Sequence, residues 1–252
     1  MSQPRRPTRP TSVDASSAVS TPLSPTPLSP TPRSTIRRGA ARARAQRSEL
    51  YAVLDEARIC HLGVVRDGAP VVLPTAFGRC GDTLYLHGST GAASLRTAAA
   101  GEPISVAVTL LDGVVHARSV FHFSMNYRSA VVHGVARQVT DPTERLVGLR
   151  SIVEQVAPGG WAHARGPNRK ELAATKVLAL DLAEASLKVR SGPPIDDEHD
   201  LRDDETRGRW AGVVPLHTMP GAAEPCPHVP AGSAVPVHVR HVAAAAAAHQ
   251  DS

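Results

Sequence analysis

A histidine and several hydroxyl-bearing residues lie close together in the first half of the sequence. His87 is followed by a loop of small residues and then by the start of a short helix that carries Arg96. Backbone amides, hydroxyls and a guanidinium together form the kind of site that holds a phosphate group. We therefore predict a phosphate site made of Ser89, Thr90, Ser94 and Arg96, with Gly88 in the same loop as a further cofactor-binding residue. The alternative is an ordinary capped helix with an exposed arginine.

The segment before this loop, residues 71–77, is rich in apolar and β-branched residues and is predicted to be a strand. Pro74 lies inside it and cannot donate a hydrogen bond to a neighbouring strand. We expect the strand to be a sheet edge at this point, or to be interrupted by a bound ligand. Backbone groups of Leu73, Pro74, Thr75 and Ala76 would then be available to a planar heterocycle.

Short strands joined by turn signals, with a few helices at the periphery, predict a mainly β protein with a closed or half-closed barrel. Asp67-Gly68 is a strong hairpin signal, and tight hairpins argue against a doubly wound α/β fold. Asp141 followed by Pro142 predicts the start of a helix. Gly134 predicts a bulge near the end of a long strand.

Composition divides the 252 residues into three parts. Residues 1–45 are rich in Pro, Ser, Thr and Arg, and we expect a disordered leader. Residues 46–216 form the folded domain, and residues 217–252 form a poorly ordered tail rich in Pro, Ala and His. Residues 1–47 hold nine arginines and one acid, so the rest of the chain carries −3 against +5 overall. The positive charge is therefore local, and we do not expect a nucleic-acid partner.

No apolar run reaches the roughly 20 residues that would span a bilayer. The first residues also lack the apolar segment of a secretory signal. We expect a cytoplasmic protein without a membrane partner.

Five stretches together resemble the pyridoxamine 5′-phosphate oxidase-like family, the FMN-binding split β-barrels. The branch that they resemble most holds the nitroimidazole-resistance-type reductases. In family order and spacing, over roughly residues 48–216, the stretches are residues 73–77, 84–89, 121–129, 188–194 and 210–216.

This resemblance implies a homodimeric split β-barrel with FMN as its cofactor, bound at two sites between the subunits. It implies an FMN-dependent oxidoreductase acting on a small molecule, with nitroreductase-like activity as the first choice and NAD(P)H as a reductant. One alternative is a flavin-binding or storage module without turnover. Another is a deazaflavin- or haem-binding relative on the same barrel.

The resemblance also implies roles for individual residues. His87 would lie near flavin and substrate as a catalytic proton donor, or else be a structural histidine. Asn126, Arg128 and Ser129 would lie near the dimer interface and the second subunit's flavin, although Arg128 fits an interface salt bridge equally well. Lys188, Arg190 and Trp210 would contact the substrate or the second subunit.

Two alternatives remain open for these positions, and a metal site is not expected. Lys188 and Arg190 share one face of a strand, and that face either binds an anionic substrate or is simply solvated. Trp210 either packs in an interface or stacks on the flavin. We expect no metal, because His116 and His122 have no third ligand at a suitable spacing.

Overall fold

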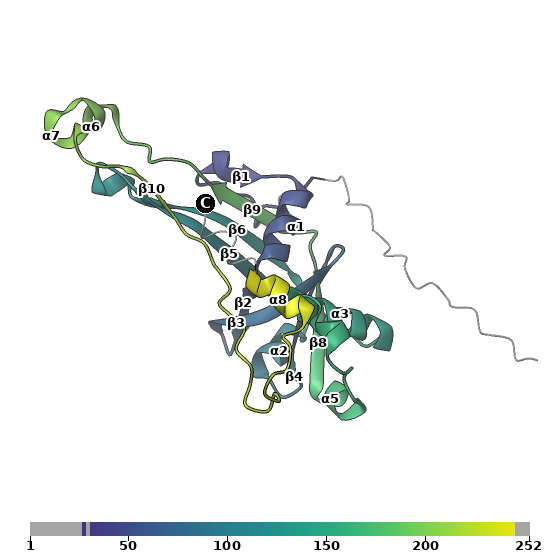
Figure 1. The fold of residues 1–252 in the computed structure, drawn as a ribbon. Coiled ribbons are helices and arrows are strands. Elements are labelled where there is room, and N and C mark those ends of the chain that lie inside the picture. Colours follow the sequence, from purple (N-terminus) through teal and green to yellow (C-terminus); the bar gives the residue numbers. More distant parts are fainter. Residues whose placement is uncertain (1–26, 29–30, 245–252) are drawn as a thin grey trace, which may run out of the picture.

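The computed structural model describes residues 27–28 and 31–244. A ten-stranded sheet dominates it, with the strand order β1-β9-β6-β5-β2-β3-β4-β8-β7 and with β10 added to β5 (Figure 1). In chain order the strands are β1 (Ala43–Arg44), β2 (Ile59–Arg66), β3 (Ala69–Cys80), β4 (Thr83–Ser89), β5 (Pro103–His116), β6 (Ser124–Val135), β7 (Arg137–Gln138), β8 (Thr175–Asp181), β9 (Ala185–Arg190) and β10 (Gly212–Pro215).

Helices surround this sheet or extend from its ends. They are η1 (Ala40–Arg42), α1 (Arg47–Glu56), α2 (Ala93–Ala98), η2 (Val120–His122), α3 (Pro142–Val156), α4 (Gly160–His163), α5 (Arg169–Ala174), α6 (Glu198–Arg202), α7 (Asp204–Arg207) and α8 (Val237–Ala244). Within the described ranges, none of these helices combines the length and apolar character needed to cross a bilayer.

The sheet curls into a barrel, so that β8, near one end of the strand order, comes back into contact with β6, near the other end. All the pairings between described strands are antiparallel, and β7, which pairs with β8 at one end of the sheet, directly follows β6. The barrel encloses a core of fully buried apolar side chains that includes Leu62, Phe77, Leu86, Val106 and Leu180. The split β-barrel predicted from the sequence is therefore confirmed.

The barrel is split where β3 changes partner. Residues 69–76 pair with β2, and residues 77–80 pair with β4. On the second edge of residues 69–76, no strand among the described residues is paired. Pro74 lies opposite His61 within this one-sided stretch, so the predicted edge is confirmed, although β3 itself runs on unbroken.

Two local predictions are confirmed and a third is wrong. Asp67 and Gly68 both have positive φ, 53° and 77°, as the tight hairpin requires. The Asp141 side chain caps α3 by accepting from the Glu144 amide at 2.6 Å. Gly134, however, pairs in register with Ile104, and the irregularity in this pair of strands falls between Leu111 and Gly113. Gly134 instead permits a close approach, because a Cβ there would lie 2.8 Å from Leu180 Cδ1.

Strands β5 and β6 continue past the barrel as a long arm (Figure 1). β10 pairs with the outer part of β5, and α6 and α7 form a small lobe at the far end of the arm. We call residues 111–125 together with 210–216 the arm. The arm therefore holds residues 121–125 of one matched stretch and all of residues 210–216, away from the barrel (Figure 1).

The described structure begins before residue 46, the predicted start of the domain. Leu28 is buried in the core and its amide donates to the Ala45 carbonyl at 2.8 Å. Thr31 and Arg33 both donate to Glu184, and β1 pairs with β9. Residues 31–45 are thus held against the barrel by specific contacts. The predicted disorder of residues 1–26 and 29–30, and of residues 245–252 in the tail, lies outside the described residues.

Candidate functional site

The split between β3 and β4 opens beside His87. Phe77 and Leu86 are the last paired residues, and both point into the core. Because side chains alternate along a strand, Ala76 and His87 face the opposite side, where α3 packs. The one-sided backbone of residues 73–76 and His87 therefore both adjoin the point at which the β3–β4 pairing ends. The structure thus brings the backbone of residues 73–76 close to His87. The Thr75 side chain is an exception, because it points inward on the same face of β3 as Phe77.

His87 has an unused hydrogen-bonding atom. Its Nδ1 atom is buried and has no hydrogen-bond partner within the described part of the chain. Burial lowers the pKa of His87 below its ordinary value, so the ring is neutral at pH 7. A buried polar atom without a partner is rare in folded proteins and marks a position where a ligand atom would be accommodated.

The predicted phosphate loop has a compact internal structure. Ser89 Oγ accepts from the Gly91 amide at 3.2 Å, and Arg96 Nη1 donates to the Gly91 carbonyl at 2.7 Å. A Cβ on Gly88 would lie 2.5 Å from Leu95 Cδ1, so this position favours glycine. Ser94 lies half-buried in α2. Ser89 and Arg96 thus stabilise the loop, with part of the Arg96 guanidinium still exposed.

A cavity of about 280 Å³ lies next to this loop, between β8 and the start of α3. Its lining is basic and rich in hydroxyls: Thr90, Gln138, Val139, Thr140, Arg145, Ala173, Thr175, Lys176 and Val177. Of the predicted phosphate residues, Thr90 alone lines it. Arg145 donates through Nη2 to the carbonyls of Leu172 and Thr175, and its buried Nε has no partner among the described residues. The Arg145 guanidinium is therefore held in place at the cavity, and its Nε–H group is a donor without a partner among the described residues.

Sequence reasoning missed Arg145 and Lys176. Arg145 lies in the first turns of α3, and Lys176 is on β8 opposite Gly88 of the predicted loop. They meet only because α3 crosses the β4–β8 pair. A basic residue directly before the last core strand was the available signal for Lys176, but nothing near Arg145 distinguished it from a solvated helix residue.

The second group of predicted residues lies on β6 and β9, across the sheet from His87. Arg128 forms ion pairs with Glu56 of α1 and Asp112 of β5. The hydrogen bonds to these two carboxylates raise the pKa of Arg128. Within one chain, Arg128 is thus a structural ion-pair residue that joins α1 to the base of the arm. Ser129 Oγ lies 3.4 Å from Thr109 Oγ1 on the neighbouring strand.

Asn126 and Arg190 form a buried pair. Asn126 Oδ1 accepts from Arg190 Nη1, and Asn126 Nδ2 donates to the Gly192 carbonyl at 3.1 Å. Burial lowers the pKa of Arg190. Lys188 shares a strand face with Arg190, as predicted, but its Nζ donates to the Arg38 carbonyl at 3.0 Å. The N-terminal segment therefore occupies part of the face that was expected to be free.

Trp210 lies on the arm and is exposed. Its ring meets the His116 ring edge-on, with 5.6 Å between centroids, and His116 meets Phe123 in the same manner at 5.3 Å. Sheet order separates all these positions from His87 by several strands. One chain therefore holds two separate groups of predicted residues, one at the split and one along β6, β9 and the arm.

Comparison with known proteins is consistent with this geometry. The family model of pyridoxamine 5′-phosphate oxidase matches residues 46–189. The flavocytochrome Anf3 from Azotobacter vinelandii shares 36% identity over 86% of this chain and 99% of its own, with a TM-score of 0.78. The FAD- and heme-binding protein from Mycobacterium smegmatis shares 43% identity over 80% of this chain and 97% of its own, with a TM-score of 0.76.

A 5-nitroimidazole antibiotic resistance protein from Bacteroides thetaiotaomicron is more distant, at 19% identity over 58% of this chain and 86% of its own, with a TM-score of 0.49. The comparison with curated protein sequences finds no match. The family model covers more than half of the chain, and the first two structures match most of it at well above 30% identity. The chain therefore belongs to the pyridoxamine 5′-phosphate oxidase-like family of flavin-binding proteins.

Proposed function

We propose that this protein binds a flavin nucleotide and a haem, and that it transfers electrons from NAD(P)H to a small-molecule acceptor in the cytoplasm. The observation that carries the proposal is the 43% and 36% identity, over most of both chains, to an FAD- and heme-binding protein and to a flavocytochrome. Electron transfer between two bound cofactors is the simplest common use of such a pair.

The split supports the flavin site. A flavin ring is a planar heterocycle with hydrogen-bonding groups along one edge, and the unpaired edge of residues 73–76 offers backbone groups to such an edge. His87 Nδ1 provides a buried atom without a partner beside it. A neutral His87 would orient the ring or the substrate by a hydrogen bond and hold a proton at a defined atom.

The neighbouring cavity bears on the choice between FMN and FAD. The sequence predicts FMN, and the Mycobacterium smegmatis protein binds FAD. FAD has a second phosphate and an adenosine, and the cavity with Arg145 and Lys176 provides basic residues for them beyond the Thr90 loop. We therefore favour FAD. If the cavity does not contribute to cofactor binding, we expect FMN instead.

One face of the arm supports the haem site. The register of β10, β5 and β6 brings Val214, Val114 and Met125 onto one face together with His116. The rings of Phe123 and Trp210 flank His116. A haem is a flat apolar macrocycle whose iron is commonly bound by histidine. An apolar face around a single half-buried histidine fits that requirement, with His116 as the iron ligand.

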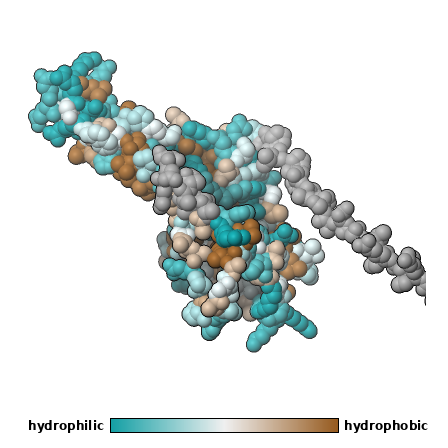
Figure 2. Space-filling view, in the orientation of Figure 1, coloured by the Kyte–Doolittle hydropathy of each residue, from teal (hydrophilic) through white to brown (hydrophobic). Residues whose placement is uncertain are grey.

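The arm also supports the homodimer. Val120 and Phe121 near its tip are 90% and 84% exposed, and apolar side chains line the arm between barrel and lobe (Figure 2). Large exposed apolar patches mark interaction surfaces. A second copy seated on the arm would bring its own arm residues towards the split, which would unite the two groups of predicted residues.

A bound flavin would supply acceptance of a hydride equivalent and onward transfer of single electrons, for which a bound haem is a carrier. This chain's residues would bind both groups, exclude water and hold a proton at His87. Nitro-aromatic compounds, which the sequence predicts as acceptors, are the first candidates for the small molecule that takes up the electrons. The alternative is a flavin-storing module without turnover.

The test is purification of the full chain, a visible spectrum and mass spectrometry of the released cofactors. We expect bound FAD and a Soret band, and bleaching of the flavin by NADPH or NADH with reoxidation by an acceptor. His116→Ala should lose the Soret band and keep the flavin, whereas His228→Ala in the exposed tail should keep both. A colourless protein that does not bind added FAD or FMN would refute the proposal. Bound flavin without turnover would favour the storage module.

A further inference from the structure

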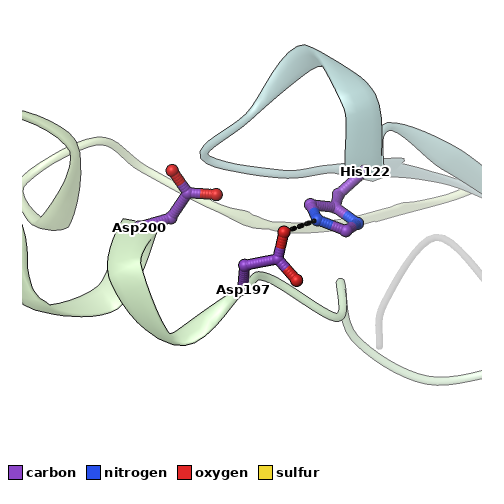
Figure 3. Close-up of side chains that lie close together, drawn as sticks. All are labelled: His122, Asp197 and Asp200. Carbon is purple, nitrogen blue, oxygen red and sulfur yellow. Dashed lines mark ion pairs between the residues drawn. The ribbon is translucent and has the colours of Figure 1, made fainter.

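Three side chains with metal-binding groups lie together where η2 meets the α6 lobe (Figure 3). His122 lies at the end of η2, and Asp197 and Asp200 lie at the start of α6. One ligand atom from each residue lies within 4.8 Å of the other two, and His122 Nε2 is 3.1 Å from Asp197 Oδ2. The cluster lies beyond the apolar arm face around His116, so it is separate from the proposed haem site.

Two atoms of this cluster are buried without a hydrogen bond. Asp200 is only 6% exposed, and its Oδ2 has no hydrogen-bond partner among the described residues. His122 Nε2 is likewise buried, and its contact with Asp197 does not meet hydrogen-bond geometry. A buried carboxylate oxygen without a partner is costly, because the protein replaces none of the hydration that it loses. Something other than the described side chains is needed to satisfy it.

The charges around the cluster also favour a bound cation. The neighbouring Asp196 carboxylate is paired with Arg118 at 2.7 Å, which uses the nearby guanidinium. Asp200 Oδ1 lies 3.4 Å from the exposed His199 ring. No lysine or arginine in the described ranges forms an ion pair with Asp197 or Asp200. The two carboxylates therefore leave a local charge that a divalent cation would neutralise.

We propose that His122, Asp197 and Asp200 bind a divalent transition metal of the zinc class. The imidazole nitrogen favours zinc or a related transition metal, all of which accept nitrogen together with carboxylate oxygen, whereas magnesium and calcium prefer oxygen alone. Zinc lies roughly 2.0–2.2 Å from such ligands, which keeps tetrahedral ligand atoms about 3.4 Å apart. Metal binding would therefore require small side-chain rotations that bring the three atoms from within 4.8 Å to that spacing. The fourth position is left to water.

The metal would join segments that are far apart in the sequence. His122 follows β5, and Asp197 and Asp200 follow β9, so coordination fastens the α6–α7 lobe to the end of the arm. The sequence suggests only His116 as a partner for His122 and predicts no metal, because a third ligand is missing, and in the structure His116 packs against Phe123 and Trp210. The two partners of His122 come from the charged segment after residue 195, which showed no spacing signal of its own.

The test is zinc binding to the full chain after removal of metals with a chelator. Exposed Cys80 and Cys226 also attract zinc, so both are replaced by serine in every sample. Titration calorimetry and metal analysis after dialysis should give one tightly bound zinc per chain. Asp197→Asn and Asp200→Asn should each weaken it at least tenfold, and His228→Gln should leave it unchanged. The Asp197 side chain is 59% exposed, so the Asp197→Asn variant should fold. It therefore still tests the site if the Asp200→Asn variant fails to fold.

Trypsin cleavage after Arg202 and Arg207 gives a second readout that does not depend on flavin or haem. Zinc should slow cleavage in the wild-type protein and not in the Asp197→Asn variant. The proposal is overturned if the wild-type protein retains no zinc, or if both aspartate variants bind zinc as tightly as the wild type. Neither result bears on cofactor binding at the split, because the lobe and the split are at opposite ends of the molecule (Figure 1).

Discussion

Gly78 of β3 lies directly against Ser151 of α3: a Cβ atom at residue 78 would be 2.3 Å from the Ser151 carbonyl carbon. The neighbouring atoms of Ser151 and Ile152 belong to the backbone, so no side chain could rotate away to make room. This contact sets how closely α3 packs on the sheet beside the split. The same helix carries Arg145 of the basic cavity, which makes the Gly78 contact part of the support of the candidate site.

Gly78→Ala should therefore destabilise the protein by about 3 kcal/mol, the upper part of the range for overpacking. Chemical denaturation measures the free energy of unfolding. Gly166→Ala is the matched control, because a Cβ at residue 166 meets nothing within 4 Å. Equal stability of the two variants would contradict the close approach of α3.

His87 makes the stability depend on pH. Burial lowers the pKa of His87 in the folded state, so below about pH 6.5, the usual value for histidine, the unfolded chain takes up a proton that the folded chain does not. Stability is therefore fully present above pH 6.5 and is lost as the pH falls towards the folded-state pKa. One such group contributes a slope of at most about 1.4 kcal/mol per pH unit.

His87→Gln should flatten this slope between pH 7 and pH 5, measured by urea denaturation at several pH values. Burial also lowers the pKa of His133, so part of the slope should remain. His228→Gln, in the exposed tail, is the control for the loss of one histidine. A His87→Gln variant with the wild-type slope would mean that burial does not lower the pKa of His87 in the folded protein.

Arg128 connects α1, β5 and β6 through Glu56 and Asp112. Arg128→Leu would leave two carboxylates near each other without their cation. Because all three groups are partly exposed, we expect a loss of about 1–2 kcal/mol, more than for a single surface pair. Thermal or chemical denaturation measures it.

Arg165→Leu is the matched control for this ion-pair network. Arg165 pairs with one carboxylate, Glu171, on the surface, and its replacement should cost less than about 0.5 kcal/mol. If the two arginine variants lose the same stability, the network at Arg128 contributes no more than an ordinary surface pair.

The exposed apolar tip of the arm gives a test of the proposed dimer. Replacing Val120 and Phe121 together by aspartate should convert a dimer of 26.5 kDa chains to monomers, because two charges would have to be buried in the interface. Light scattering after size-exclusion chromatography measures the mass. Val147→Asp on α3, where the valine is 40% exposed, is the control and should remain dimeric. A double variant that keeps the wild-type mass would show that the arm tip lies outside the interface.

Local features of this protein could be predicted from the sequence. The Asp67-Gly68 hairpin, the Asp141 cap and the sheet edge at Pro74 each depend on residues that are neighbours in the chain. Turn, cap and edge preferences are set by backbone sterics and by hydrogen bonds within a few residues. The split-barrel fold followed from the order and spacing of the matched stretches.

Only the tertiary structure decided which side chains meet. Thr90 reaches the basic cavity, whereas Arg96 closes its own loop, and Arg145 reaches the cavity from a helix more than fifty residues later. Gly134 faces Leu180 instead of making a bulge. His122 meets Asp197 and Asp200, not His116. These outcomes depend on strand register and on how closely helices approach the sheet, and both are fixed by packing between residues that are distant in the sequence.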